Sequence, residues 1–542
     1  MTIQLAGNSP DPSLQQSRLL TPEDGTMLGA ARCPTPWLAT TRVSKGLPRQ
    51  TSHWAICFSV TCLLAVIHLT AANDQRLVEA VKQLDSETIE ALLAMGIDVN
   101  VPEVDGTAAL HWAVHHDAPN LVDQLLQAGA QVGTANRYGI QPLSIASING
   151  NADIVESLLE AGADPNTSQP EGETVLMTAA RSGSVEVVDL LVGRGADVNA
   201  RETWRGQTAT MWAAAEGHTE VVRLLLRHGA DVHARSTFPE GVDVRRMSRR
   251  VMRTAQPDGL TPILFAVRAG HMDTVNALLE AGVHINETAP SGNSLLHLAI
   301  MNAHFELAAT LLEKGADPNA AGPMPLALTP LHHLIQVRRP VWTLRPDPVP
   351  TGNLDSLQLM KLLLAHGAHV DAPLPPPPER RRSGVDADEA IPPPGGGATP
   401  LWLAARGPDP DAMRLLFAAG ADPTVKTDDG VTLLMSAAGI DYRQGPREKL
   451  ETQVLEAVAM VLELGADVTA ADANGNTALH GAAIRGANST VRLLLEQGAK
   501  IDAKNDRGRI PLDIAEDASD ARSQPETAAL LRKLIQESGG AQ

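Results

Sequence analysis

GETVLMTAARSGSVEVVDLLVGRGADVNA, residues Gly172–Ala200, is the stretch that decides the fold of this chain. In its first part, Thr174–Arg181, apolar residues recur at helical spacing, and Gly183 then interrupts the pattern. A second apolar run, Val185–Val192, ends before Gly195, and a glycine there can take the left-handed conformation that closes a helix. The stretch therefore predicts two short antiparallel helices followed by an extended turn.

The closing glycine of this unit recurs along most of the chain. Five of the ten intervals between successive copies are 33 residues, one is 34, and the other four are 45 to 53. A fixed period of this length indicates a stacked repeat, and the longer intervals indicate one period plus an insertion. The copies are Gly96, Gly129, Gly162, Gly195, Gly229, Gly282, Gly315, Gly367, Gly420, Gly465 and Gly498.

A second motif opens most of the units. It reads GLTPILFA at Gly259–Ala266, GATPLWLA at Gly397–Ala404 and GNTALHG at Gly475–Gly481. With this motif and this period, the chain resembles the ankyrin repeat family from about residue 74 to residue 537. The resemblance implies an all-α fold: an ankyrin-repeat solenoid of about twelve helix-turn-helix units with short β-hairpin-like turns, stabilised by contacts between neighbouring units.

The residue types of the opening motif suit a helix start. Thr261 and Thr477 are expected to cap the first helix through the side-chain oxygen. Prolines fit the first turn, where a missing N–H costs nothing, and they stand at Pro262, Pro330 and Pro400. The family resemblance implies that the motif histidine bonds backbone between neighbouring turns; these histidines are His111, His297, His332 and His480.

The repeats are expected to fill residues 73–538, between a disordered segment 1–50 and a disordered tail 539–542. Asp74–Asn100 lacks the opening motif and Arg507–Glu537 lacks the closing glycine, so these two segments are predicted to cap the array. Four insertions are expected at about residues 236–257, 339–353, 372–396 and 441–452. The third contains PLPPPPERRR and PPPGGG, which cannot bury enough apolar surface to fold.

Residues 51–72 have the pattern of a targeting segment. Trp54–Ala72 is uncharged and mostly apolar, and it follows Arg42, Lys45 and Arg49. A basic region, an apolar region and a small-residue exit are typical of a secretory signal, so an exported protein, periplasmic or secreted, is expected. The alternative is an uncleaved signal-anchor helix that tethers the chain to a membrane, because 19 residues are near the lower limit of spanning length.

The sequence carries no recognisable catalytic motif. There is no nucleophile elbow, phosphate-binding loop, dinucleotide-binding glycine pattern or zinc-protease motif. His111 and His115 share a helix face by spacing, but no further ligand completes a metal site. With 63 acidic and 44 basic residues the net charge is −19, which opposes binding of nucleic acid. We therefore expect no enzyme activity, no metal, no cofactor and no nucleic-acid partner.

The resemblance implies that a partner binds the concave face, which is built from the turn tips and the exposed ends of the first helices. We expect a non-catalytic, monomeric scaffold that binds another protein through an acidic or extended segment. Tryptophan and arginine are common interface anchors, and the candidate contact residues are Arg137, Tyr138, Arg181, Arg201, Trp204, Arg205, Arg268, Arg406 and Arg485.

The alternative function is a membrane-associated scaffold. It would use the 54–72 helix together with the insertion 236–257, in which five arginines occur within VRRMSRRVMR. If that insertion is helical, the arginines gather on one side, where they suit anionic lipid headgroups or an acidic partner. The competing interpretation is a solvated flap that pairs with the acidic repeats.

Overall fold

The computed structural model describes residues 75–237, 259–324, 326–338, 349–376, 396–440, 451–517 and 524–539. These residues all belong to one compact unit, residues 69–542. The expected segments 1–50 and 51–72, most of the four expected insertions, and the expected tail beyond residue 539 lie outside the described residues.

The described residues form helix pairs, which confirms the all-α repeat fold and the expected number of units. In each of twelve pairs a short first helix is followed by a second helix. The first helices are α2 (Arg76–Lys82), α4 (Ala109–His115), α6 (Pro142–Asn149), α8 (Val175–Ser182), α10 (Ala209–Glu216), α13 (Pro262–Ala269), α15 (Leu295–Met301), α17 (Pro330–Arg338), α19 (Pro400–Arg406), α21 (Leu433–Ala438), α23 (Ala478–Arg485) and α25 (Pro511–Ala515). The second helices are α3 (Ser86–Ala94), α5 (Pro119–Gln127), α7 (Ala152–Glu160), α9 (Val185–Gly193), α11 (Thr219–Arg227), α14 (Met272–Glu280), α16 (Phe305–Glu313), α18 (Ser356–Ala365), α20 (Pro410–Ala418), α22 (Glu451–Glu463), α24 (Asn488–Glu496) and α26 (Pro525–Gly539).

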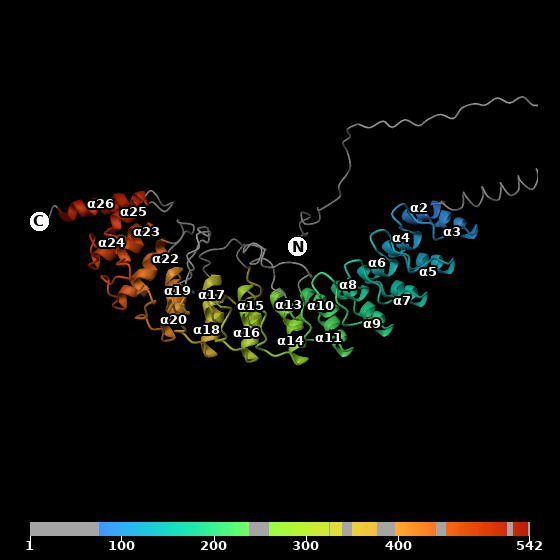
Figure 1. The fold of residues 1–542 in the computed structure, drawn as a ribbon, viewed down its shortest axis with the longest axis horizontal. Coiled ribbons are helices and arrows are strands. Elements are labelled where there is room, and N and C mark those ends of the chain that lie inside the picture. Colours follow the sequence, from blue (N-terminus) through green and yellow to red (C-terminus); the bar gives the residue numbers. More distant parts are fainter. Residues whose placement is uncertain are drawn as a thin grey trace, which may run out of the picture. The chain divides into compact units, whose positions relative to one another are not determined.

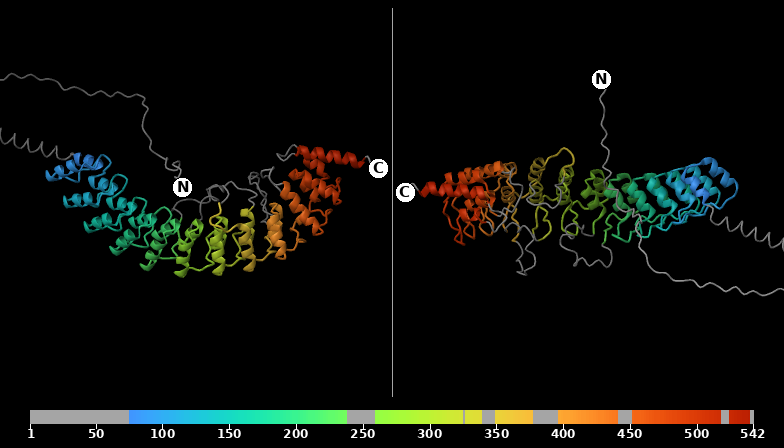
Figure 2. Two further views of the ribbon diagram at one scale, coloured as in Figure 1. Left: turned by 180° about the vertical axis from the view of Figure 1, so that it is seen from behind. Right: turned by 90° about the horizontal axis from the view of Figure 1, so that it is seen from above.

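The two helices of each pair belong to two separate rows. First helices pack on the first helices of neighbouring pairs, such as α10 on α8 and α13, and second helices pack on second helices, such as α11 on α9 and α14. Figures 1 and 2 show the two rows following the sequence from blue to red. A row of small side chains allows this close packing of first helices: fully buried alanines occupy the same position in ten of them, at Ala113, Ala146, Ala179, Ala213, Ala266, Ala299, Ala404, Ala437, Ala482 and Ala515.

The unit that opened the sequence analysis folds as expected. The Thr174 side chain caps α8 by accepting the Met177 N–H, and Gly183 ends the helix at a φ of 82°. The Ser184 side chain then caps α9. Short hairpin-like turns also occur, because the pairs Ser168–Thr174, Thr288–Ser294 and Ala471–Thr477 form isolated antiparallel bridges.

The predicted caps at two other threonines are wrong. The Thr261 hydroxyl caps nothing and instead donates to Glu287 Oε1 at 2.6 Å, which joins two neighbouring units. The Thr477 hydroxyl lies 3.0 Å from the His480 ring nitrogen Nδ1. The proline prediction is confirmed, since α13, α17 and α19 all begin at the expected prolines.

Three of the four motif histidines tie their own unit to the next one, as the resemblance implied. The ring of His111 accepts the Ala108 N–H at Nδ1, which leaves the proton on Nε2, 3.2 Å from the Ile140 carbonyl of the next unit. His297 and His480 make the same pair of bonds, to the carbonyls of Leu328 and Arg509. His332 differs, because its buried Nε2 has no partner among the described residues.

A row of asparagines joins the extended turns on the other side of the pairs. Asn199 accepts the Asp231 N–H at 2.8 Å and donates to the Gly229 carbonyl at 3.0 Å, so one side chain satisfies two backbone groups of the next unit. The same two bonds are made by Asn100, Asn166 and Asn319. The asparagine that stands four residues after Gly96, Gly162, Gly195 and Gly315 therefore joins its unit to the next one.

None of the described helices combines the length and the apolar composition needed to cross a bilayer.

Candidate interaction surface

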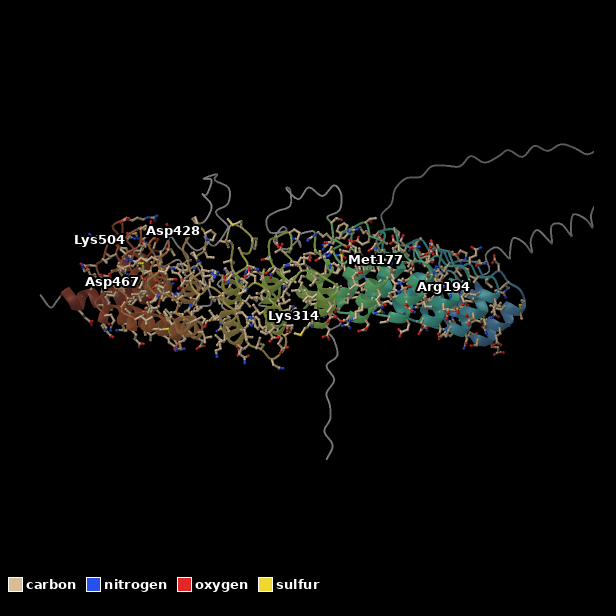
Figure 3. All side chains as sticks on the ribbon, turned by 90° about the horizontal axis from the view of Figure 1, so that it is seen from below. Met177, Arg194, Lys314, Asp428, Asp467 and Lys504 are labelled. Carbon is tan, nitrogen blue, oxygen red and sulfur yellow. The ribbon has the colours of Figure 1, made fainter. Side chains whose placement is uncertain are left out.

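The first helices α4 to α15 and the turn tips before them share an exposed surface, which we call the first-helix face. The turn tips are fixed by backbone bonds from one tip to the next, for example from the Arg137 N–H to the Asp105 carbonyl at 2.8 Å. Large apolar or aromatic side chains lie at least partly exposed on this face at Trp112, Tyr138, Ile148, Trp204, Trp212 and Met301. Figure 3 draws the side chains of the array, with Met177 on α8 of this row and Arg194 at the end of the second helix α9.

Arg181 lies over an aromatic ring of the next unit. Its guanidinium carbon lies 4.7 Å from the centre of the Trp212 ring, and one guanidinium nitrogen lies 3.4 Å from Glu173 Oε1. Almost half of the Arg181 side chain is exposed. The cation is thus positioned by stacking and keeps an accessible edge for a carboxylate.

Arg268, two first helices further along, lies over an aromatic ring of its own helix α13 instead. Its guanidinium carbon lies 5.4 Å from the centre of the Phe265 ring, and the side chain is half-buried. Burial lowers the pKa of Arg268, and the positive charge of Arg205 lowers it further. Two arginines therefore repel each other on neighbouring units, and an anion placed between them would relieve that repulsion.

The turn tip before α10 presents Trp204 outward. Its side chain is 61% exposed, although Trp is among the side chains that bury the largest areas. Beneath it, the buried Glu202 carboxylate accepts the backbone N–H groups of Trp204, Arg205 and Gln207. The tip is therefore rigid while the Trp204 and Arg205 side chains face outward.

Two other predicted contact residues are partly used within the fold. Arg137 donates a hydrogen bond to the Tyr138 hydroxyl and lies 4.7 Å from the centre of that ring, and this bond raises the pKa of Arg137. Both side chains remain exposed. Arg201 donates to the carbonyls of Gly206 and Arg235, at 3.1 and 2.6 Å, so its guanidinium connects neighbouring turns.

The structure removes two predicted residues from this surface. Arg406 is only 5% exposed, with its guanidinium 5.8 Å from the Trp402 ring centre, so the expectation that it is exposed is wrong. Arg485 is half-buried and donates to the carbonyls of Ala437 and Arg406, at 3.2 and 3.1 Å. Gly439, the residue after α21, leaves room for this side chain, because a Cβ there would lie 3.0 Å from the Arg485 Cβ and 3.2 Å from its Nε.

At the first repeats, aromatic and charged groups form a compact cluster. Trp112 donates to Glu103 Oε2 at 2.8 Å and carries the Lys82 ammonium 5.0 Å from its ring centre. His115 stacks edge-on against Trp112, with ring centres 5.6 Å apart. Over the residues that the structure describes, no group of three or more His, Cys, Asp and Glu side chains is arranged to hold a metal.

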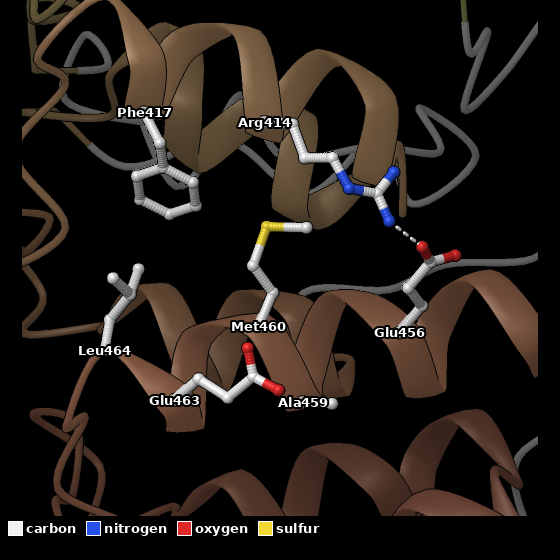
Figure 4. A pocket seen from close by; sticks show the side chains of 7 residues that line it. All are labelled: Arg414, Phe417, Glu456, Ala459, Met460, Glu463 and Leu464. Carbon is white, nitrogen blue, oxygen red and sulfur yellow. Dashed lines mark hydrogen bonds and ion pairs between the residues drawn. The ribbon is translucent and has the colours of Figure 1, made fainter.

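A hollow lies in the row of second helices, between α20 and α22. Phe417, Met460 and Leu464 line its apolar part, and the ion pair of Arg414 with Glu456 closes one end (Figure 4). It is a shallow, open surface feature rather than an enclosed site.

The sequence analysis missed a second set of histidines. His218 Nε2 lies 2.9 Å from the Arg181 carbonyl, and His271 and His304 make the equivalent contact with the carbonyls of Ala215 and Arg268. Each ring packs on a glycine of the preceding unit, where a Cβ would come within about 2.6 Å; these are Gly183, Gly217 and Gly270. A histidine directly before the second helices α11, α14 and α16, which follows a glycine at Gly217 and Gly270, was the signal that could have revealed them.

Comparison with known proteins agrees with this architecture. The model of the family described as ankyrin repeats (3 copies) matches residues 77–169, 143–236, 240–321 and 450–535, and the ankyrin repeat model matches residues 396–428. The chain belongs to the ankyrin repeat family. Ankyrin repeats generally mediate interactions between proteins.

The similar ankyrin repeat proteins are matched over very different shares of their own length. Human ankyrin repeat and SOCS box protein 16 is 29% identical over 254 residues, which are 47% of each chain. The Arabidopsis thaliana E3 ubiquitin-protein ligase KEG is 26% identical over 257 residues, which are 46% of this chain but 13% of that protein. The chain thus spans half or less of the relatives it matches. The human ASB11 ankyrin repeat domain aligns with 45% of this chain at 23% identity and a TM-score of 0.37.

Proposed function

We propose that this ankyrin repeat protein is a monomeric, non-catalytic scaffold that binds an acidic, extended segment of another protein on its first-helix face. The observation that supports it most is the pair of stacked arginines, Arg181 on Trp212 and Arg268 on Phe265. Stacking on a ring holds the planar guanidinium in one orientation, and a guanidinium recognises carboxylates in a two-bond geometry. Trp204 beside them supplies an exposed apolar anchor.

The spacing of the arginines sets the spacing of the segment's acidic residues. Arg181 is on α8 and Arg268 is on α13, with α10 between them. Packed helices lie about 8–10 Å apart and an extended chain advances about 3.3 Å per residue, so one repeat corresponds to roughly three residues. The segment we propose therefore carries two carboxylates about six residues apart, with an apolar residue between them opposite Trp212.

A pair of labelled peptides tests this proposal. One carries two glutamates six residues apart with a central leucine, and the other has the same composition with the glutamates adjacent. We expect the first to bind at least tenfold more tightly and to lose that advantage in Arg181→Ala. Arg194→Ala is the matched control, because Arg194 lies at the end of α9 in the row of second helices and pairs with Glu156 and Glu160. Equal binding of the two peptides would contradict the proposal.

We also propose that the protein acts outside the cytoplasm after removal of an N-terminal signal. The support is the uncharged Trp54–Ala72 run after three basic residues, followed by small residues. Mass spectrometry of the protein from each cell fraction tests this by locating the mature N-terminus. A start near Asn73 in a soluble extracytoplasmic fraction supports export. An intact 54–72 segment in the membrane fraction contradicts cleavage and favours the membrane-associated scaffold, for which flotation with anionic liposomes is the next test.

A further inference from the structure

Three histidines gather in the core where α15, α17 and α19 meet. His297 of α15 and His332 of α17 have no exposed surface, and His333 of α17 is 8% exposed. The rings of His297 and His333 meet edge to face, with centres 5.0 Å apart. Gly322 covers them, since a Cβ there would lie 3.5 Å from both His297 Nε2 and His333 Cε1.

Two ring nitrogens of this cluster lack partners among the described residues. They are His332 Nε2 and His333 Nδ1, and both are fully buried. A buried polar atom without a hydrogen bond is costly, and a buried cation without a counter-charge is more costly still. The rings are therefore tolerated only in the neutral form.

His333 stands at a position that is apolar in the adjacent units. Aligned by the opening motif, Leu298 of α15 and Leu403 of α19 occupy the same place on their helices. At the position of His332 other first helices carry Met177 and Met435. The polar cluster is therefore not required by the repeat geometry, and its removal is compatible with the fold.

The charges around the cluster do not stabilise a proton on it. Burial lowers the pKa of His333 to about 3, with further lowering by His297 and His332. Burial also lowers the pKa of His332 to about 4, and it outweighs the backbone groups of Ala372 and Ala398, which act in the opposite direction. Asp317, in the turn after α16, raises the pKa of His297, but burial outweighs it. Lys361 of α18 and Arg406 of α19 are the cations on the other packed helices, and neither is among the groups that shift the pKa of His333.

We propose that the α15–α17–α19 junction is a pH-sensitive break in the array, at which protonation of His332 and His333 opens the repeat contacts while the flanking repeats stay folded. Repeat arrays are held together by contacts between neighbouring units, so weakening one contact separates two folded blocks. This inference does not depend on the proposed partner. With the junction open, the first-helix face and the C-terminal units would no longer be held in a fixed position relative to each other.

The direction of the pH effect follows from proton binding. An unfolded histidine takes up a proton with a pKa of 6.5, whereas these rings stay neutral in the closed array to well below that value. The stability of the junction is thus complete above pH 6.5 and is lost as the pH falls toward the lower values. Between pH 7.5 and pH 5, each of the two rings favours the open state by about 30-fold.

Hydrogen exchange of the full chain at pH 7.5 and pH 5, corrected for intrinsic exchange rates, tests the proposal. We expect the opening equilibrium of residues 295–338 to rise at least about 30-fold at pH 5, with little change in residues 142–193. That segment is an internal control, because Ser144 and Met177 stand at its motif-histidine positions. Equal changes in the two segments would overturn the proposal without any variant.

Two substitutions use residues that the repeats already accept at these positions. His333→Leu should reduce the pH-dependent rise by about 30-fold, and His332→Met should do the same. If either variant loses protection at both pH values, the other one and the wild-type comparison still decide the outcome. A rise that is unchanged in both folded variants would also overturn the proposal.

Discussion

Arg338 and Asp409, 71 residues apart in sequence, form a buried two-bond ion pair between the end of α17 and the start of α20. The Arg338 nitrogens lie 2.8 and 3.0 Å from the two carboxylate oxygens, and a third nitrogen donates to the Ser356 hydroxyl at 2.5 Å. Asp409 is fully buried and also caps α20 by accepting the Ala412 N–H. One carboxylate therefore connects two repeats and starts a helix.

Replacing Asp409 by asparagine should destabilise the C-terminal half of the array. Asn keeps the size and the capping oxygen but leaves the nearly buried guanidinium without its counter-charge, which typically costs about 3–5 kcal/mol. Urea unfolding followed by hydrogen exchange of α17 to α20 measures the effect. Loss of protection should start in these helices and not in α4 to α10.

The surface pair of Arg414 and Glu456 is the matched control for that experiment. Both side chains are about half exposed, and such pairs are usually worth less than about 1 kcal/mol. Arg414→Ala should therefore leave the unfolding free energy almost unchanged. If both substitutions had the same small effect, the buried pair would not be a stabilising connection between the repeats.

The asparagine row predicts a graded effect at Asn199. Asn199→Ala removes one bond from the Asp231 N–H and one to the Gly229 carbonyl, for a loss of about 1–2 kcal/mol. Asn199→Asp keeps the acceptor and loses only the donor, so its loss should be smaller. The natural Asp371 already shows this reduced form, accepting the Asp422 N–H. Thermal unfolding of both variants measures the order, and a larger loss for Asp than for Ala would contradict it.

Two glycines with the same backbone conformation should respond differently to alanine. Gly183 and Gly195 have φ values of 82° and 94°, so alanine costs about 1–2 kcal/mol of backbone strain at either one. At Gly183 the new Cβ would also meet the His218 ring at 2.6 Å, whereas at Gly195 no heavy atom lies within 4 Å. Gly183→Ala should therefore lower the melting temperature more than Gly195→Ala, and equal shifts would show that the His218 ring moves without cost.

The repeat fold could be predicted because local rules act in every unit. The helix pair of residues 172–200 has its caps, breaks and apolar runs within one period, and each later copy repeats the same information. The bonds between units were harder to predict, because their partners are far apart in sequence, from 26 residues for Thr261 and Glu287 to 79 for Arg485 and Arg406, and depend on which groups face each other. Thr261 illustrates this: its sequence position suits a cap, but its hydroxyl accepts no capping N–H and donates to Glu287 of the next unit.

The candidate surface was predicted only in part for a related reason. Arg181, Arg205 and Arg268 are at the expected helix ends and tips and remain at least partly exposed. Arg406 stands at the equivalent helix position and is buried instead. Position within the repeat fixes the direction of the Cα–Cβ bond, but exposure also depends on the neighbouring units, which differ after each insertion.

Replacing Trp204 and Arg205 together by alanine should weaken binding of the spaced acidic peptide at least tenfold without changing the fold. The fold should hold because Glu202 binds the backbone N–H groups of this turn tip and not the two side chains. Binding should fall because the tip loses its exposed aromatic anchor together with the cation whose charge lowers the pKa of Arg268. Arg223→Ala, on the second helix α11, is the control with a similar change in charge and exposure. Fluorescence anisotropy at two salt concentrations gives the affinity and its electrostatic part. An unchanged affinity in the double variant, with the melting temperature preserved, would remove Trp204 and Arg205 from the binding surface.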